Sequence, residues 1–282
     1  MMRLALCVQT PEVEPDLPVA LLSGTFEDKL AKAARFGADG VELMTVDPAR
    51  LEAAEVSAAL ARHGLKVAAI GSGGVKFATG LTLLHPEPDK AEQALRRLYN
   101  LIEFATVLGA PLVTVGSLRG WQAPVGPTGR ARLVEMLRQA SAYAAPRRVR
   151  LVVEPLNRYE ADLINNAEQG LAFVNEVNHP ALGLLLDTFH VNIEETSWTE
   201  PFRRVMAAGR LWHVHLGDNN RLPPGQGLID FAAIVRTLHQ IGYTGWLSAE
   251  LLARPDPDTA AEQTVRHMRP LLAMTDSAPG NK

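Results

Sequence analysis

Four residues of the kinds that bind divalent cations each follow a short apolar run in the second half of the chain. The runs cover residues 150–153, 182–186, 211–214 and 245–249, and the residues that follow them are Glu154, Asp187, His215 and Glu250. Three carboxylates and one imidazole form an oxygen-rich set that suits a single hard cation and leaves coordination positions for a substrate. This pattern predicts a metal-dependent enzyme.

Short apolar runs alternate with amphipathic segments along the whole chain, which predicts strands that alternate with helices. We expect strands at residues 3–8, 40–44, 66–70, 111–115, 150–153, 182–186, 211–214 and 245–249. We expect helices at residues 26–36, 51–63, 89–108, 131–145, 167–177, 200–208, 230–241 and 258–273. The glycine-rich segment 71–74 is expected to be a flexible loop that opens an irregular stretch to about residue 88.

Strict alternation of this kind allows either an open doubly wound sheet or a closed barrel. A barrel is favoured because the carboxyl ends of its parallel strands all lie at one mouth, where the four candidate ligands would converge. No Gly-x-Gly-x-x-Gly motif follows the first strand, which argues against a dinucleotide-binding open sheet. The prediction is an α/β protein with a single-domain (β/α)8 TIM barrel at residues 1–274 and a flexible C-terminal tail at residues 275–282.

The composition of the 282-residue chain narrows the range of partners and locations. Lys and Arg number 28 against 31 Asp and Glu, for a formal charge of −3, which argues against nucleic acid as a partner. No apolar run approaches the roughly 20 residues needed to cross a bilayer, and the N-terminus is too briefly apolar for a signal peptide. We therefore expect a cytoplasmic protein without membrane contact. The one cysteine, Cys7, lies in the first apolar run and is expected to be a core thiol.

Three segments of the second half resemble a known group of enzymes. They read EPLNRYE at residues 154–160, LDTFHVNIEE at 186–195 and HVHLGDNNR at 213–221. Together with LPPGQG at 222–227 and GYTG at 242–245, they are similar to the xylose isomerase-like sugar isomerase/epimerase superfamily, and most similar to its ketose 3-epimerases of the D-tagatose 3-epimerase type. The resemblance is dense from about residue 152 to residue 251 and thins to general barrel character before residue 109.

The resemblance implies a role for each candidate residue. It implies a metal site, filled by Mn²⁺ or else by Mg²⁺ or Co²⁺, that is formed by Glu154, Asp187, His215 and Glu250. It implies substrate contacts from Glu160, His190 and Arg221. It also implies that Glu154 and Glu250 flank the bound ketose as an acid/base pair, and that the chain forms a homodimer or homotetramer.

The implied chemistry is consistent with these residue types. The proton on a carbon next to a carbonyl is too weakly acidic for a free carboxylate, and a divalent cation that binds the carbonyl and a neighbouring hydroxyl stabilises the enediolate. Two carboxylates on opposite faces of the sugar then allow proton removal on one side and return on the other, which inverts C3 of a free ketose. The alternative is an aldose–ketose or hydroxypyruvate-type isomerase, or an inosose dehydratase-like lyase, that uses the same metal site.

The first half of the chain departs from the epimerase pattern, because the aromatic residues expected at the ends of the first and fourth strands are not evident. Arg119, if it points inward, would suit a carboxylate or phosphate on the substrate, and Trp121 could supply the missing apolar wall.

Glu42 could reach the site or pair with a neighbouring basic residue. His213 shares a strand face with His215 and lies one layer deeper, so we expect a core histidine or one that orients a carboxylate.

Two other classes of protein are disfavoured. The endonuclease IV-type DNA-repair enzymes of the same superfamily need a three-zinc cluster that includes a histidine in the loop after the seventh strand, and residues 221–227 contain none. A barrel that binds a sugar or a partner without catalysis would not need the complete set of four ligands.

Overall fold

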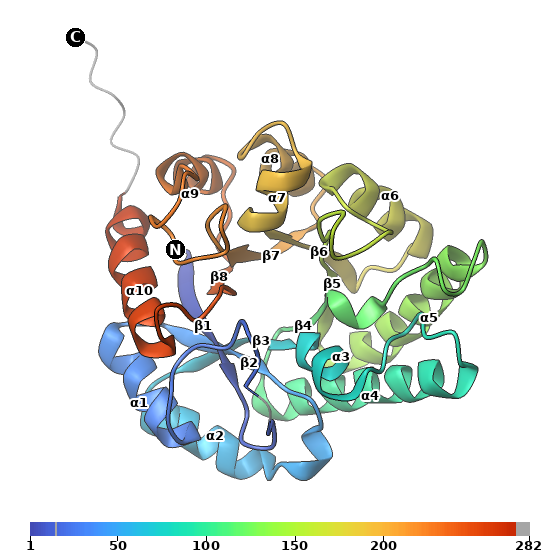
Figure 1. Ribbon diagram of the computed structural model, residues 1–282, viewed down its shortest axis with the longest axis horizontal. Helices are drawn as coiled ribbons and strands as arrows, with labels where there is room; N and C mark the ends of the chain where they lie inside the picture. The colour runs from blue at the N-terminus through green and yellow to red at the C-terminus, as the bar shows by residue number, and fades with distance from the viewer. Residues whose placement is uncertain (15, 275–282) are drawn as a thin grey trace.

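Eight parallel strands form a closed barrel in the computed structural model, which describes residues 1–14 and 16–274. In pairing order the strands are β1 (Arg3–Gln9), β2 (Gly40–Met44), β3 (Lys66–Gly71), β4 (Leu112–Val115), β5 (Arg150–Val153), β6 (Leu182–Asp187), β7 (Leu211–Leu216) and β8 (Trp246–Ala249). β1 pairs with both β2 and β8, which closes the ring (Figure 1). The predicted single-domain (β/α)8 TIM barrel is confirmed, whereas the predicted tail at 275–282 lies outside the described residues.

Helices surround the ring of strands (Figure 1). They are α1 (Phe26–Phe36), α2 (Ala53–Arg62), α3 (Gly73–Thr79), α4 (Pro88–Leu108), α5 (Gly129–Ala144), α6 (Ala167–Val177), α7 (Thr188–Glu194), α8 (Glu200–Ala207), α9 (Phe231–Gln240) and α10 (Pro257–Ala273). None of the helices within the described residues is long and apolar enough to span a membrane.

Two short helices, α3 and α7, depart from the predicted alternation. The expectation of a loop at 71–74 followed by an irregular stretch to about residue 88 is wrong at Gly73–Thr79, where α3 forms. Gly74 of α3 packs tightly against the Leu17 side chain, which would lie 3.0 Å from a Cβ at this position. Such tertiary packing offsets the poor helix propensity of glycine. α7 follows β6 directly, because the Asp187 side chain accepts a hydrogen bond from the Phe189 N–H at 2.8 Å and caps the first turn.

The core has a layer between helices and strands and a layer inside the barrel. α4, for example, buries Ala94, Leu98 and Leu101 at helical spacing, and each large apolar side chain buried in this way contributes about 1.5–3 kcal/mol. A separate cluster takes one residue from each of the adjacent strands β3 to β6 and lies inside the barrel: Ala69, Leu112, Val152 and Leu185. Apolar side chains therefore fill this part of the barrel, and the residues at the carboxyl ends of the strands lie at its mouth.

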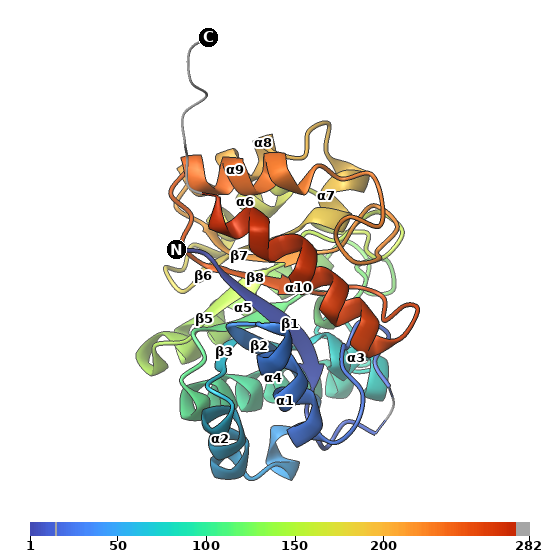
Figure 2. The ribbon, with the colours of Figure 1, turned by 90° about the vertical axis from the view of Figure 1, so that its left-hand side faces the viewer.

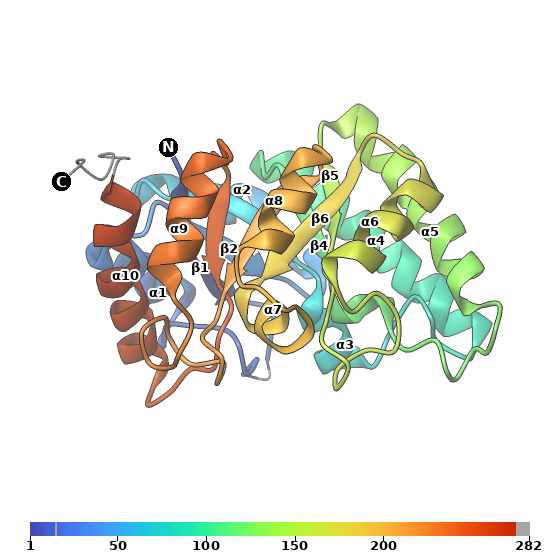
Figure 3. The same cartoon turned by 90° about the horizontal axis from the view of Figure 1, so that it is seen from above.

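The mouth at the carboxyl ends of the strands carries the additional helices. Figure 3 shows α3 and α7 at one end of the barrel and the N-terminus at the other. Figure 2 shows α10 along the outside of β1 and beside α1, so the last helix packs against the first strand and the first helix. Because all eight strands are parallel, every strand delivers the residue after its last position to the same end.

Candidate metal centre

Glu154, Asp187, His215 and Glu250 converge at the mouth of the barrel. Each offers one ligand atom, and these four atoms all lie within 4.8 Å of one another. Nδ1 of His215 lies 3.5 Å from Oε1 of Glu154 and 3.6 Å from Oε2 of Glu250. Glu154 and Glu250 directly follow β5 and β8, Asp187 ends β6, and His215 is the penultimate residue of β7. Four neighbouring strands thus bring together residues that are up to 96 positions apart in the sequence.

Three of these side chains carry a buried polar atom without a hydrogen-bond partner among the described residues. The atoms are Oε1 of Glu154, Oδ2 of Asp187 and Nδ1 of His215. Buried acceptors without a donor are rare, because losing water without gaining a partner costs about 1–3 kcal/mol each. Three such atoms, in a cluster whose ligand atoms lie within 4.8 Å of one another and which includes Glu250, fit a divalent cation with oxygen and nitrogen ligands.

The three carboxyl groups of this cluster have shifted pKa values, because they are buried and lie close to one another and to charged neighbours. Burial, with the nearby Glu154 carboxylate, raises the pKa of Asp187 to about 8. Burial and Glu250 also raise the pKa of Glu154. Burial alone would raise the pKa of Glu250, but His215 and Arg221 outweigh it and lower that pKa to about 2. A bound cation would favour the ionised form of all three carboxyl groups.

The three residues expected to contact a substrate lie around this cluster. Arg221 donates hydrogen bonds to Oε1 of Glu160 at 2.8 Å and to Oε2 of Glu250 at 3.1 Å, and its guanidinium lies over the Phe189 ring. His190 is buried, and its Nε2 has no hydrogen-bond partner among the described residues and lies 3.9 Å from Oε1 of Glu154. The structure brings Glu160, His190 and Arg221 next to the four candidate ligands, and their contact with a substrate stays a prediction.

A cavity of about 430 Å³ opens beside the cluster, which is a size typical of small-ligand sites. Glu154, Glu160, Arg221 and Glu250 supply its polar lining. Its apolar lining includes Met44, Phe77, Trp121 and Leu252. Trp121 therefore lies where an apolar wall was expected, whereas Phe77 was not anticipated, because it belongs to α3, within the stretch predicted to be irregular.

Arg119 does not face the cavity, so the idea that it holds an anionic group of the substrate is wrong. Its side chain is completely buried, and its guanidinium donates to four backbone carbonyls. These carbonyls belong to Gly116, Glu154, Leu163 and Ile164, and the bond to Glu154 is 2.6 Å long. Arg119 thus joins the loops after β4 and β5 and fixes the backbone from which the Glu154 side chain projects.

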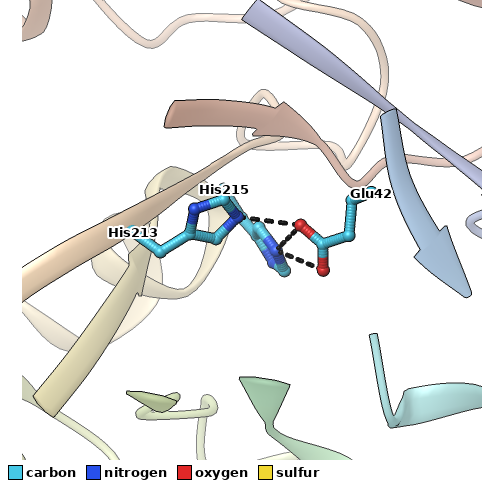
Figure 4. Close-up of side chains that lie close together, drawn as sticks. All are labelled: Glu42, His213 and His215. Carbon is cyan, nitrogen blue, oxygen red and sulfur yellow. Dashed lines mark hydrogen bonds and ion pairs between the residues drawn. The ribbon is translucent and has the colours of Figure 1, made fainter. Parts of the chain in front are cut away.

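Glu42 and His213 lie one layer below the candidate ligands. Glu42 is in the middle of β2 rather than at its end, and the Nε2 atoms of His213 and His215 both lie within hydrogen-bonding distance of its carboxylate (Figure 4). The two alternatives for Glu42 were that it reaches the site or that it pairs with a neighbouring basic residue. Each is partly right, since its carboxylate contacts the candidate ligand His215 and also His213. Of the two expectations for His213, the one that it orients a carboxylate agrees with this contact.

Comparison with known proteins adds the family context. A family model described as a xylose isomerase-like TIM barrel matches residues 30–271. The chain is 32% identical over 255 residues to the L-ribulose 3-epimerase of Methylomonas sp. (strain DH-1), which covers 89% of this chain and 87% of that protein. It is 32% identical over 217 residues to the ketose 3-epimerase of Arthrobacter globiformis, covering 76% of this chain and 73% of that protein. The crystal structure of a D-allulose 3-epimerase from Methylomonas sp. is similar with a TM-score of 0.77 and 25% identity, covering 96% of this chain and 99% of that chain.

Proposed function

Because the chain belongs to the xylose isomerase-like TIM barrel family, we propose that it is a divalent-metal-dependent sugar epimerase that inverts C3 of a free ketose. The observation that carries the proposal is the pair of glutamates, Glu154 and Glu250. They line one cavity beside buried atoms of Asp187 and His215 that have no hydrogen-bond partner in the part of the chain that the structure describes. Its relatives are isomerase-class enzymes named for ketose substrates, which supports the same class of reaction here.

The metal would be held by the carboxylates of Glu154, Asp187 and Glu250 and by Nδ1 of His215. This donor set favours a hard cation, for which we propose Mn²⁺, with Mg²⁺ or Co²⁺ as substitutes. When bound, the cation supplies Lewis-acid stabilisation of the negative charge that develops on the sugar oxygens during proton removal.

Glu154 and Glu250 are proposed as the acid/base pair. They project from β5 and β8, and their nearest oxygens lie at similar distances, 3.5 and 3.6 Å, from Nδ1 of His215. A ketose bound between them would present opposite faces of C3 to the two carboxyl groups. One carboxylate then takes the C3 proton and the other carboxyl group returns a proton to the opposite face, so that the configuration at C3 inverts.

The surrounding residues would orient the sugar. Arg221 is fixed by Glu160 and Glu250 and can still present its remaining N–H groups to a hydroxyl. Nε2 of His190, which lies 3.9 Å from Oε1 of Glu154, is proposed to contact a second hydroxyl. Phe77 and Trp121 would cover the C–H faces of the sugar and limit the access of water.

The test is an incubation of the purified chain with D-fructose, D-tagatose and L-ribulose in D₂O containing Mn²⁺. We expect the C3 epimer of at least one ketose, with one deuterium at C3. Deuterium confined to C1 or C2, with an aldose as product, would overturn the proposal in favour of aldose–ketose isomerisation.

Glu154→Gln and Glu250→Gln are expected to lower kcat by about 10²–10⁴-fold. The Mn²⁺ content of each variant has to be measured as well, because the same residues are proposed ligands. Glu168→Gln is the matched control, since the Glu168 side chain is 84% exposed on α6. A control that loses as much activity as the two site variants would contradict the assignment.

A further inference from the structure

Glu42 is a buried carboxylate inside the barrel. The residue is 1% exposed, and it extends from β2 to the side chains of β7, although these strands are separated in the ring by β1 and β8. Figure 4 shows its carboxylate pointing at the imidazole rings of His213 and His215. Burying an ionised carboxylate this deeply costs free energy unless hydrogen bonds satisfy its oxygens. The contacts of Glu42 with the two imidazole rings therefore indicate its role.

Both oxygens of Glu42 are engaged by imidazole nitrogens. Nε2 of His213 lies 2.8 Å from Oε2, and Nε2 of His215 lies 3.2 Å from Oε1 and 3.1 Å from Oε2. An ionised carboxylate only accepts hydrogen bonds, so each Nε2 must carry the hydrogen. A neutral His215 ring with its hydrogen on Nε2 has its one lone pair on Nδ1, the atom that faces Glu154 and Glu250.

We propose that Glu42 is a positioning residue that fixes the tautomer and the ring orientation of His215, so that Nδ1 is presented to the divalent cation. His213 holds the same carboxylate from a second direction and prevents it from rotating. This inference rests on the proposed metal-dependent function. Carboxylates that accept the second N–H of a metal-binding histidine commonly strengthen metal binding 10- to 100-fold.

A second cation between Glu42, His213 and His215 is the competing interpretation, since ligand atoms of these three residues also lie within 4.8 Å of one another. The chemistry of His215 argues against it. Its neutral ring has a single lone pair, and a ring that binds a cation through Nδ1 carries a hydrogen on Nε2 and cannot bind another there. The three residues are at most 1% exposed, and none of them lines the cavity.

The first experiment measures the tautomer directly in the protein loaded with diamagnetic Zn²⁺. We expect the ¹⁵N chemical shifts of His215 to indicate a protonated Nε2 and a metal-bound Nδ1. A hydrogen on Nδ1, or a cation on Nε2, would overturn the proposal without any variant, so the proposal does not depend on whether a substituted chain folds.

The second experiment titrates Mn²⁺ by calorimetry into the metal-free wild type, Glu42→Gln and Glu42→Met. Gln retains one acceptor and a similar volume, whereas Met retains no acceptor, so we expect a graded loss: a few-fold for Glu42→Gln and 10- to 100-fold for Glu42→Met. Glu12→Met is the matched control, because Glu12 is also a buried carboxylate, 8% exposed, but accepts from the backbone N–H groups of Val46 and Asp47. The control should bind Mn²⁺ with the wild-type Kd.

Each remaining outcome decides the proposal. A Kd for Glu42→Met within twofold of the wild type, or two Mn²⁺ per wild-type chain falling to one in the variant, would refute it. If the wild type binds one Mn²⁺ in the expected graded series but epimerises no ketose, the proposed function fails and the role of Glu42 stands. If the wild type binds no Mn²⁺, both fail.

Discussion

Gly116→Ala should weaken metal binding without unfolding the barrel. Gly116 follows β4, and an added Cβ would lie 2.5 Å from Oε2 of Glu154 and 3.6 Å from its Cδ. Ordinary contacts lie near 3.5 Å, so the end of the Glu154 carboxylate has to retreat by about 1 Å. The clashing atom is the end of a flexible side chain, which can move. We therefore expect the substitution to displace the Glu154 carboxylate, a proposed metal ligand, rather than to disrupt the fold.

The size of the effect follows from the geometry of the ligands. Metal–oxygen distances tolerate changes of only about 0.2 Å, and a group displaced by about 1 Å at a reaction centre costs on the order of 100-fold. We therefore expect Mn²⁺ to bind Gly116→Ala about 10- to 100-fold more weakly, which corresponds to about 1.4–2.7 kcal/mol, and kcat to fall as well.

Calorimetric titration with Mn²⁺ measures this effect, and a thermal melt of the metal-free protein checks the fold. Gly73→Ala is the matched control, because a Cβ at Gly73 would make only ordinary contacts, 3.6 Å to Oγ of Ser117 and 3.7 Å to Cε of Met44. The reasoning is refuted if Gly116→Ala binds Mn²⁺ as tightly as Gly73→Ala and the wild type do.

Two further predictions follow from the buried charges. Burial raises the pKa of Asp187 to about 8, so below that pH a cation must displace the proton of this carboxyl group in order to bind. The affinity for Mn²⁺ should therefore rise about tenfold per pH unit between pH 6 and 7 and level off above about pH 8. Calorimetry in buffers of different ionisation enthalpy counts the released protons, and an affinity independent of pH would contradict the assignment. Arg119→Met should lower the free energy of unfolding in urea by about 2–4 kcal/mol, because buried carbonyls such as those of Glu154 and Leu163 lose their donor. An unchanged stability together with a selective loss of binding of phosphorylated ketoses would restore its role as a substrate contact.

The barrel could be predicted from sequence because each strand is a short apolar run and most helices are amphipathic over several turns. The bounds differ slightly, since β7 extends to Leu216 and β6 includes Asp187. α3 and α7 could not be predicted in this way, because seven residues are too few to display a helical period. α3 in addition begins with two glycines, and its stability comes from tertiary packing that the local sequence does not encode.

The convergence of the four candidate ligands followed from one rule, that all strands of a parallel barrel end at the same mouth. The positions of Arg119 and Glu42 could not be derived from such a rule. Arg119 bonds to a carbonyl 45 residues away, and Glu42 bonds to histidines 171 and 173 residues away. Whether a charged residue faces a cavity or the interior depends on these distant partners, which a local pattern does not specify.

The most direct test of the metal centre is the anomalous diffraction of a crystal grown with Mn²⁺. We expect one strong peak per chain, about 2.0–2.3 Å from the carboxylate oxygens of Glu154, Asp187 and Glu250 and from Nδ1 of His215. No peak within reach of these four atoms, or a peak between Glu42 and His213 instead, would contradict the metal centre on which the proposed epimerase reaction depends.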